Sequence, residues 1–168
     1  MGIVFKLDTS GELSILHSFS GPDGMGATGP LLVDAAGNLF GTTAGGGEGS
    51  CDCGVLFKID SDSKYTVLLS FRGKYGELPL TALVEDPGGS LYGVTEWGGD
   101  GHCFAPHGCG VLFQITVSGE ENVLHTFGVD SLDGVTPDAL ILNEGTLYGA
   151  TSGGGEFGLG TVFQYTLN

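Results

Sequence analysis

The heptapeptide GVLFKID begins at Gly54, and close relatives begin at Gly2 (GIVFKLD), Gly110 (GVLFQIT) and Gly160 (GTVFQYT). Neighbouring copies are roughly 50 residues apart. A fixed spacing of this size indicates tandem structural repeats rather than one irregular domain. The single domain 1–168 therefore divides into repeat 1 (2–53), repeat 2 (54–109), repeat 3 (110–159) and an extra strand of a fourth repeat (160–168).

Each full repeat holds four short segments rich in β-branched and aromatic residues. In repeat 2 the first is the heptapeptide, the second ends at 68–71, the third is 81–85 and the fourth is 91–95. Short segments bounded by Gly, Asn, Asp and Pro are typical of β-strands. No segment shows a sustained period of 3.6 residues, so the sequence predicts no substantial helix.

Four strands repeated about every 50 residues are typical of β-propeller blades. We therefore expect an all-β, β-propeller-type repeat of four-stranded antiparallel blades, with three repeats per chain. An open stack of separate β-sheets is the alternative. With the third segment of each repeat innermost, the chain begins with the outer half of one blade and ends with the inner strands of another.

The connectors between these segments alternate between tight and long. In an up-and-down blade, alternate connectors lie on opposite faces, so the long ones share one face, here called the long-loop face. Long loops on a rigid scaffold commonly carry binding sites. The long connectors are 20–29, 72–79 and 128–137 after the second segments, and 44–53, 96–109 and 152–159 after the fourth.

Composition narrows the range of partners. The 168 residues carry a formal net charge of −15, and no Lys or Arg follows Lys74. Such a surface repels phosphate groups, which argues against nucleic acid as a partner. No apolar run approaches the roughly 18 residues that span a bilayer, so we expect no membrane insertion.

The repeated pattern also resembles a known family. Its elements are Gly-x-Val-Phe-Lys-Leu, then Leu-His-Ser-Phe, then Asp-Gly followed by Pro, then Gly-Asn-Leu-Phe-Gly-Thr-Thr and a glycine triplet. Together they resemble the GloVer repeat, which occurs in tandem in bacterial surface proteins. The resemblance covers essentially the whole chain and implies a propeller-like fold and an extracellular or cell-surface location. It implies no established activity and no catalytic residues.

All four cysteines lie in loops that join a fourth segment to the next repeat. An even number of loop cysteines in a protein that resembles a surface family indicates disulfides. We favour a Cys103–Cys109 bridge, whereas Cys51 and Cys53 could pair with each other, pair across blades or stay reduced. The alternative is zinc bound by these thiols with His102 and His107, although the spacing matches no common zinc framework.

Two equivalent loops carry aspartates that are candidates for calcium. Asp130 and Asp133 lie in repeat 3, and Asp23 lies at the matching place in repeat 1. Calcium prefers several oxygen ligands in a turn, but Asp-Gly is also a common turn dipeptide. His17 and His125 occupy matching positions where repeat 2 has a leucine, which favours a semi-buried packing role over a catalytic one.

The loop 96–109 supplies the candidate ligand-binding residues. Trp97 replaces a glycine of the other repeats, and the same loop holds Phe104, His102 and His107. An exposed aromatic ring beside polar groups could stack on a sugar. Alternatively, Trp97 packs beneath its own loop.

These observations predict a non-enzymatic surface protein that binds a ligand, carbohydrate being the leading candidate, on its long-loop face. No cofactor is expected apart from calcium. A structural, self-assembling protein and an extracellular hydrolase or lyase are the alternatives. Because three repeats do not close a ring, we expect self-association, either as a head-to-tail dimer that completes six blades or as an open assembly.

Overall fold

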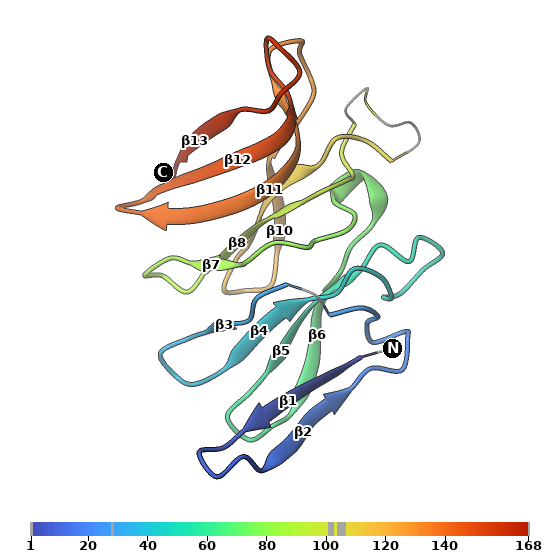
Figure 1. Cartoon of the computed structure of the whole chain (residues 1–168), viewed down its shortest axis with the longest axis vertical. Coiled ribbons are helices and arrows are strands. Elements are labelled where there is room, and N and C mark those ends of the chain that lie inside the picture. Colours follow the sequence, from blue (N-terminus) through green and yellow to red (C-terminus); the bar gives the residue numbers. More distant parts are fainter. Residues whose placement is uncertain (1, 28, 101–102, 104–106, 168) are drawn as a thin grey trace.

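A computed structural model describes residues 2–27, 29–100, 103 and 107–167. The described residues form four antiparallel sheets stacked side by side, which we call blades 1 to 4 (Figure 1). Blade 1 contains β1 (Ile3–Leu7) and β2 (Leu13–Ser18). The four-stranded antiparallel sheets confirm the predicted propeller-type fold class.

The remaining strands follow chain order within each blade. Blade 2 contains β3 (Leu32–Val33), β4 (Leu39–Thr42), β5 (Val55–Ile59) and β6 (Tyr65–Ser70). Blade 3 contains β7 (Val84–Glu85), β8 (Leu91–Thr95), β9 (Val111–Ile115) and β10 (Glu121–Thr126). Blade 4 contains β11 (Gly134–Asn143), β12 (Thr146–Gly154) and β13 (Val162–Thr166). The one helical element of the described chain is a 3-10 turn, η1 (Gly73–Tyr75).

Blades 2 and 3 therefore each join the last two strands of one repeat to the first two of the next. Blade 1 holds only the first two strands of repeat 1, and blade 4 joins the last two strands of repeat 3 to the extra strand of the fourth repeat. The tight turns gather at one end of the blades and the long loops at the other (Figure 1). Repeat 3 differs from the expected loop pattern. There, β11 and β12 extend into the predicted loops, and their ladder reaches the pair Gly134–Gly154.

A glycine in the fourth segment makes room for the phenylalanine of the heptapeptide. In blade 2, Gly41 of β4 lies opposite Phe57 of β5. A Cβ on Gly41 would lie 2.6 Å from Phe57 Cζ, so any larger residue would displace the ring. An aromatic side chain opposite a strand glycine packs over the bare backbone. The same pair recurs as Gly93–Phe113 and Gly149–Phe163.

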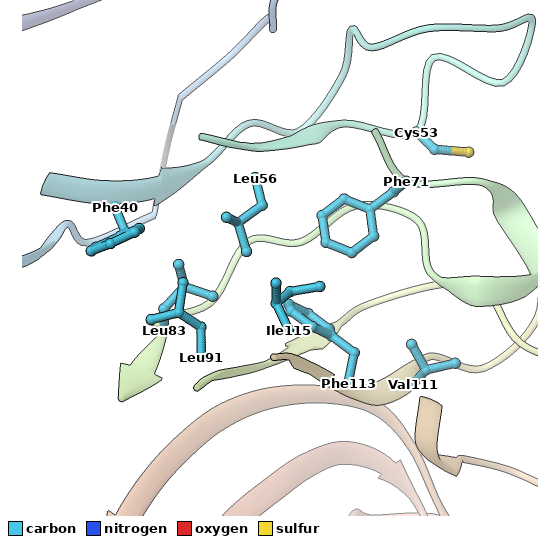
Figure 2. Packing of buried hydrophobic residues seen from close by; sticks show 9 residues of the cluster. All are labelled: Phe40, Cys53, Leu56, Phe71, Leu83, Leu91, Val111, Phe113 and Ile115. Carbon is cyan, nitrogen blue, oxygen red and sulfur yellow. The ribbon is translucent and has the colours of Figure 1, made fainter. Parts of the chain in front are cut away.

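The central strands present apolar side chains to both neighbouring blades. Along β5, Val55, Phe57 and Ile59 pack against blade 1, while Leu56 packs against blade 3. Figure 2 shows Leu56 in the second of these clusters, together with residues of β9. These four side chains are at most 1% exposed, so each inner blade contributes to two cores.

A β-bulge follows at the same place in every outer strand. The register of β5 and β6 shifts between Leu56 and Phe57, which leaves Leu68 as the extra residue. A bulge of this kind redirects adjacent side chains, and both Leu68 and Leu69 pack against the cluster shared with blade 3. Matching shifts occur at Leu16 and Leu124.

Buried threonines fasten the long loops to the following repeat. Thr43 Oγ1 donates to the carbonyl of Gly45 at 2.8 Å and accepts the N–H of Val55 at 3.1 Å. Because the hydroxyl is both donor and acceptor, it satisfies two backbone groups in a buried place. Thr95 and Thr151 make the equivalent pairs of bonds.

We expect Gly93→Ala to destabilise the protein by about 1–3 kcal/mol, the typical cost of overpacking a core. The added Cβ would lie 2.5 Å from Phe113 Cζ. Urea unfolding measures the loss. Gly2→Ala is the control, because its Cβ would meet only the ring of Phe19, at an ordinary 3.9 Å. Equal stability of the two variants would contradict the proposed role of the glycine–phenylalanine pair.

Candidate functional site

The long-loop end of blade 3 brings together a carboxylate, an indole and an imidazole. Glu77 and Trp97 face each other across two backbone hydrogen bonds of 2.9 and 3.0 Å. This bridge continues the β7–β8 hairpin toward the long-loop face, as the pair Val135–Gly153 does within blade 4. The hairpin therefore holds Glu77 and Trp97 side by side.

His107 joins this pair from the far end of the same loop. The Gly98 N–H donates to the carbonyl of His107 at 2.7 Å. His107 Nδ1 lies 3.2 Å from Glu77 Oε1, and its ring centroid lies 4.7 Å from that of Trp97. The His107 side chain is 46% exposed, whereas that of Glu77 is only 17% exposed. We call Glu77, Trp97 and His107 the loop cluster.

The loop cluster combines an aromatic surface with a hydrogen-bonded imidazole–carboxylate pair. When Nδ1–H donates to Glu77, Nε2 is left to accept a proton from a bound molecule. The carboxylate also fixes the orientation of the ring, as a histidine that acts as a base requires. The cluster can therefore stack on a ring compound and exchange a proton with it.

The structure unites two of the predicted ligand-binding residues, Trp97 and His107. Phe104 and His102 lie outside the described residues. Sequence reasoning missed Glu77, because no motif marks it. The only available signal was that Glu77 and Trp97 stand in corresponding loops of repeat 2, which a blade hairpin brings together.

The cysteines lie in two pairs at disulfide-bonding distance. The Cα atoms of Cys103 and Cys109 are 5.4 Å apart, and those of Cys51 and Cys53 are 5.1 Å apart. The first pair ties together the loop that carries His107. Paired thiols cannot also serve as zinc ligands, and paired loop cysteines favour an oxidising compartment.

Two of the aspartates predicted as calcium ligands contact the matched histidines. Asp23 Oδ2 lies 2.8 Å from His17 Nε2, and Asp133 Oδ2 lies 3.1 Å from His125 Nε2. His17 is the more buried histidine, with 18% of its side chain exposed against 43% for His125. Hydrogen bonds from Ser20 to Asp23, with others, hold the pKa of its carboxyl below its ordinary value although burial opposes them.

Calcium binding by these loops stays a prediction. Asp130 Oδ1 accepts the backbone N–H groups of Leu132 and Asp133 at 2.9 and 3.0 Å, which is the geometry of a turn-stabilising aspartate. Among the residues that the structure describes, no three His, Cys, Asp or Glu side chains gather in a way that could hold a metal ion.

A second feature is a crevice of about 590 Å³ beside the outer strand β6. It is lined by Leu68 and Leu69 of β6, by Arg72 and Tyr75 of the following loop, and by Glu121 of β10. Glu121 Oε1 is buried without a hydrogen-bond partner among the described residues. Burial raises the pKa of Glu121 to about 7, although the charge of Arg72 opposes the shift.

This raised pKa predicts a pH-dependent loss of stability. The folded protein keeps the Glu121 proton at a pH where the unfolded chain, with an ordinary pKa of 4.5, has lost it. The contribution of the protonated Glu121 to folding stability is therefore complete below pH 4.5 and is lost as the pH rises through about 7. The melting temperature of Glu121→Gln, relative to that of the wild type, should therefore rise as the pH increases from 4.5 to about 7 and stay constant above that range. A difference that does not change with pH would contradict this expectation.

Two solved structures share the fold. One, described as a gluconolactonase, matches with a TM-score of 0.63 and 18% identity over 99% of this chain and 52% of its own. The other, a gluconolactonase from Xanthomonas campestris, matches with a TM-score of 0.62 and 15% identity over 99% of this chain and 51% of its own. The chain thus spans about half the length of the structures it matches. No curated protein matches the sequence.

These comparisons correct one expectation from the sequence. We expected a non-enzymatic protein, but both of these structural neighbours are described as enzymes. The expectation rested on the lack of a recognisable catalytic motif, and that argument is weak for a repeat fold. Here side chains from separate loops, such as Glu77 and His107, come together without any characteristic spacing in the sequence.

The described residues contain no helix long and apolar enough to cross a bilayer.

The family model of the Gloeobacter/Verrucomicrobia repeat matches residues 1–168. This match agrees with the heptapeptide, the matched Leu-His and Asp-Gly positions and the strand glycines described above. The chain therefore belongs to the Gloeobacter/Verrucomicrobia repeat family.

Proposed function

We propose that the long-loop face binds a sugar-derived ring compound at the loop cluster and hydrolyses a ring ester within it. The observation that carries this proposal is the 3.2 Å contact of His107 with Glu77 beside the ring of Trp97. An aromatic face is suited to the apolar side of a sugar ring. An oriented imidazole is suited to activate water.

In this scheme His107 Nε2 takes a proton from water while the water oxygen attacks the ester carbonyl. The tetrahedral intermediate then collapses with cleavage of the ring C–O bond, and the same proton passes from His107 to the leaving alkoxide. Glu77 accepts the hydrogen bond from Nδ1–H and stabilises the transient imidazolium. The products are a hydroxyl group and a carboxylic acid on one open chain.

The choice of substrate class comes from the structural neighbours. Both are described as gluconolactonases, which act on a lactone derived from a sugar. At 18% and 15% identity this likeness shows the fold alone, so the proposed activity depends on the loop cluster. The paired cysteines and the family resemblance support a location outside the cytoplasm.

The test is hydrolysis of glucono-lactone above its spontaneous rate. We expect His107→Ala to lower kcat/KM by about a hundredfold or more, the usual share of general acid–base catalysis. Trp97→Ala should mainly raise KM, because it removes the stacking surface. His125→Ala is the matched control, since His125 also contacts a carboxylate but lies outside the loop cluster. Turnover that survives in His107→Ala would contradict the proposed site.

A separate observation favours self-association of this chain. Phe57 and Phe113 are fully buried between blades, whereas their counterpart Phe5 in blade 1 is 52% exposed. At the opposite end of the stack Val162 is 85% exposed, although its counterpart Leu56 is fully buried. We propose that the outer face of blade 4 packs on the outer face of blade 1 of a second copy, as neighbouring blades pack within the chain.

Solution mass by light scattering tests this proposal. We expect a dimer, because two chains match the length of the structural neighbours, and a growing polydisperse species would indicate an open assembly instead. Phe5→Asp should give monomers, while Leu132→Asp, at an exposed loop position, should leave the mass unchanged. A wild-type monomer at micromolar concentration would overturn the proposal.

A further inference from the structure

Equivalent positions in two blades hold very different side chains. Tyr65 is the first residue of β6 and pairs with Ile59, and Glu121 is the first residue of β10 and pairs with Ile115. Each lies in the outer strand beside the preceding blade. The two interfaces can therefore be compared position by position.

Between blades 1 and 2, an aromatic ring fills this position. The Tyr65 ring stacks on His17 with centroids 3.6 Å apart and an angle of 9° between the planes. Its hydroxyl donates to the backbone carbonyl of Asp23. His17 in turn contacts the Asp23 carboxylate. Together, the Tyr65 ring, the His17 imidazole and the loop that carries Asp23 fill this interface.

Between blades 2 and 3, all three partners are replaced. Leu69 stands where repeat 1 has His17, Tyr75 stands where it has Asp23, and Glu121 stands where blade 2 has Tyr65. The ring is absent, and the crevice of about 590 Å³ opens along these same residues. The chain itself thus shows what kind of group fits such a position, namely a ring that carries a hydrogen-bond donor.

The crevice also contains a buried hydrogen-bond acceptor that lacks a donor among the described residues. Glu121 Oε1 is buried without a partner among the described residues, and an unpaired buried acceptor is costly. Asp23 and Glu48 line the same crevice, against a single cation, Arg72. The potential in the crevice therefore favours a positively charged ligand, and the net charge of −15 reinforces this preference.

We propose that this crevice binds a small primary amine attached to an aromatic or other apolar ring. The ammonium donates to Glu121 Oε1, and the ring lies against Leu68 and Leu69 in the place that Tyr65 fills in the neighbouring interface. The site is distinct from the loop cluster, and the proposal does not depend on the hydrolytic activity.

Benzylamine is the probe, with benzyl alcohol as its neutral counterpart and phenylacetate as the anionic one. Binding is followed at about pH 8, where the Glu121 carboxyl is ionised and the amine is still protonated, by titration calorimetry and by NMR shifts of the amides of residues 68–75. We expect benzylamine to bind at least tenfold more tightly than benzyl alcohol, and phenylacetate not to bind. Equal affinity of the amine and the alcohol, or no benzylamine binding at millimolar concentration, would overturn the proposal.

Two variants separate the site from general loss of structure. Glu121→Gln keeps the shape and removes the charge, so benzylamine affinity should fall at least tenfold. Glu121→Tyr restores the residue found in the neighbouring interface, so it should fill the crevice and abolish binding while the melting temperature is kept or raised. His107→Ala should bind benzylamine like the wild type. Unchanged affinity in both Glu121 variants would exclude this crevice as the site.

Discussion

The structure depends on the packing of one aromatic ring over one bare stretch of backbone in each of blades 2, 3 and 4. Phe57 sits opposite Gly41, and the ring reaches the neighbouring blade only because the glycine has no side chain. The ring is then fully buried together with Val55 and Ile59 against blade 1. Strand pairing within a blade and packing between blades therefore rely on the same residue, so disturbing it weakens both.

This double use explains why the fold could be predicted from the sequence. The heptapeptide alternates residues for two apolar faces, and its period of about 50 residues defines a blade. The chain order of the strands follows, because sequential strands usually pair. The extension of β11 and β12 was not predictable, since repeat 3 carries the same Asp-Gly turn dipeptide as repeat 1, and the ladder becomes visible only in the pairing of Val135 with Gly153.

The loop cluster was only partly predictable, because it depends on contacts between separate loops. Trp97 stood out because it replaces a glycine, and His107 because it lies near cysteines in the same loop. Glu77 has no such mark, and its importance comes from the two backbone bonds that place it opposite Trp97. The partners of the candidate calcium ligands also could not be predicted from composition, because the contacts of Asp23 and Asp133 with histidines depend on how the loops fold.

The features that distinguish the three repeats concentrate in repeat 2 and the blade that follows it. Leu69, Tyr75 and Trp97 each depart from what repeats 1 and 3 share at the same positions. The packing pairs and threonine bonds, in contrast, recur in all three repeats, where they stabilise the contacts within and between blades. A repeat scaffold thus separates two kinds of position. Those fixed by packing must be alike in every copy, while those at the loops and blade edges can differ, and it is there that both proposed sites lie.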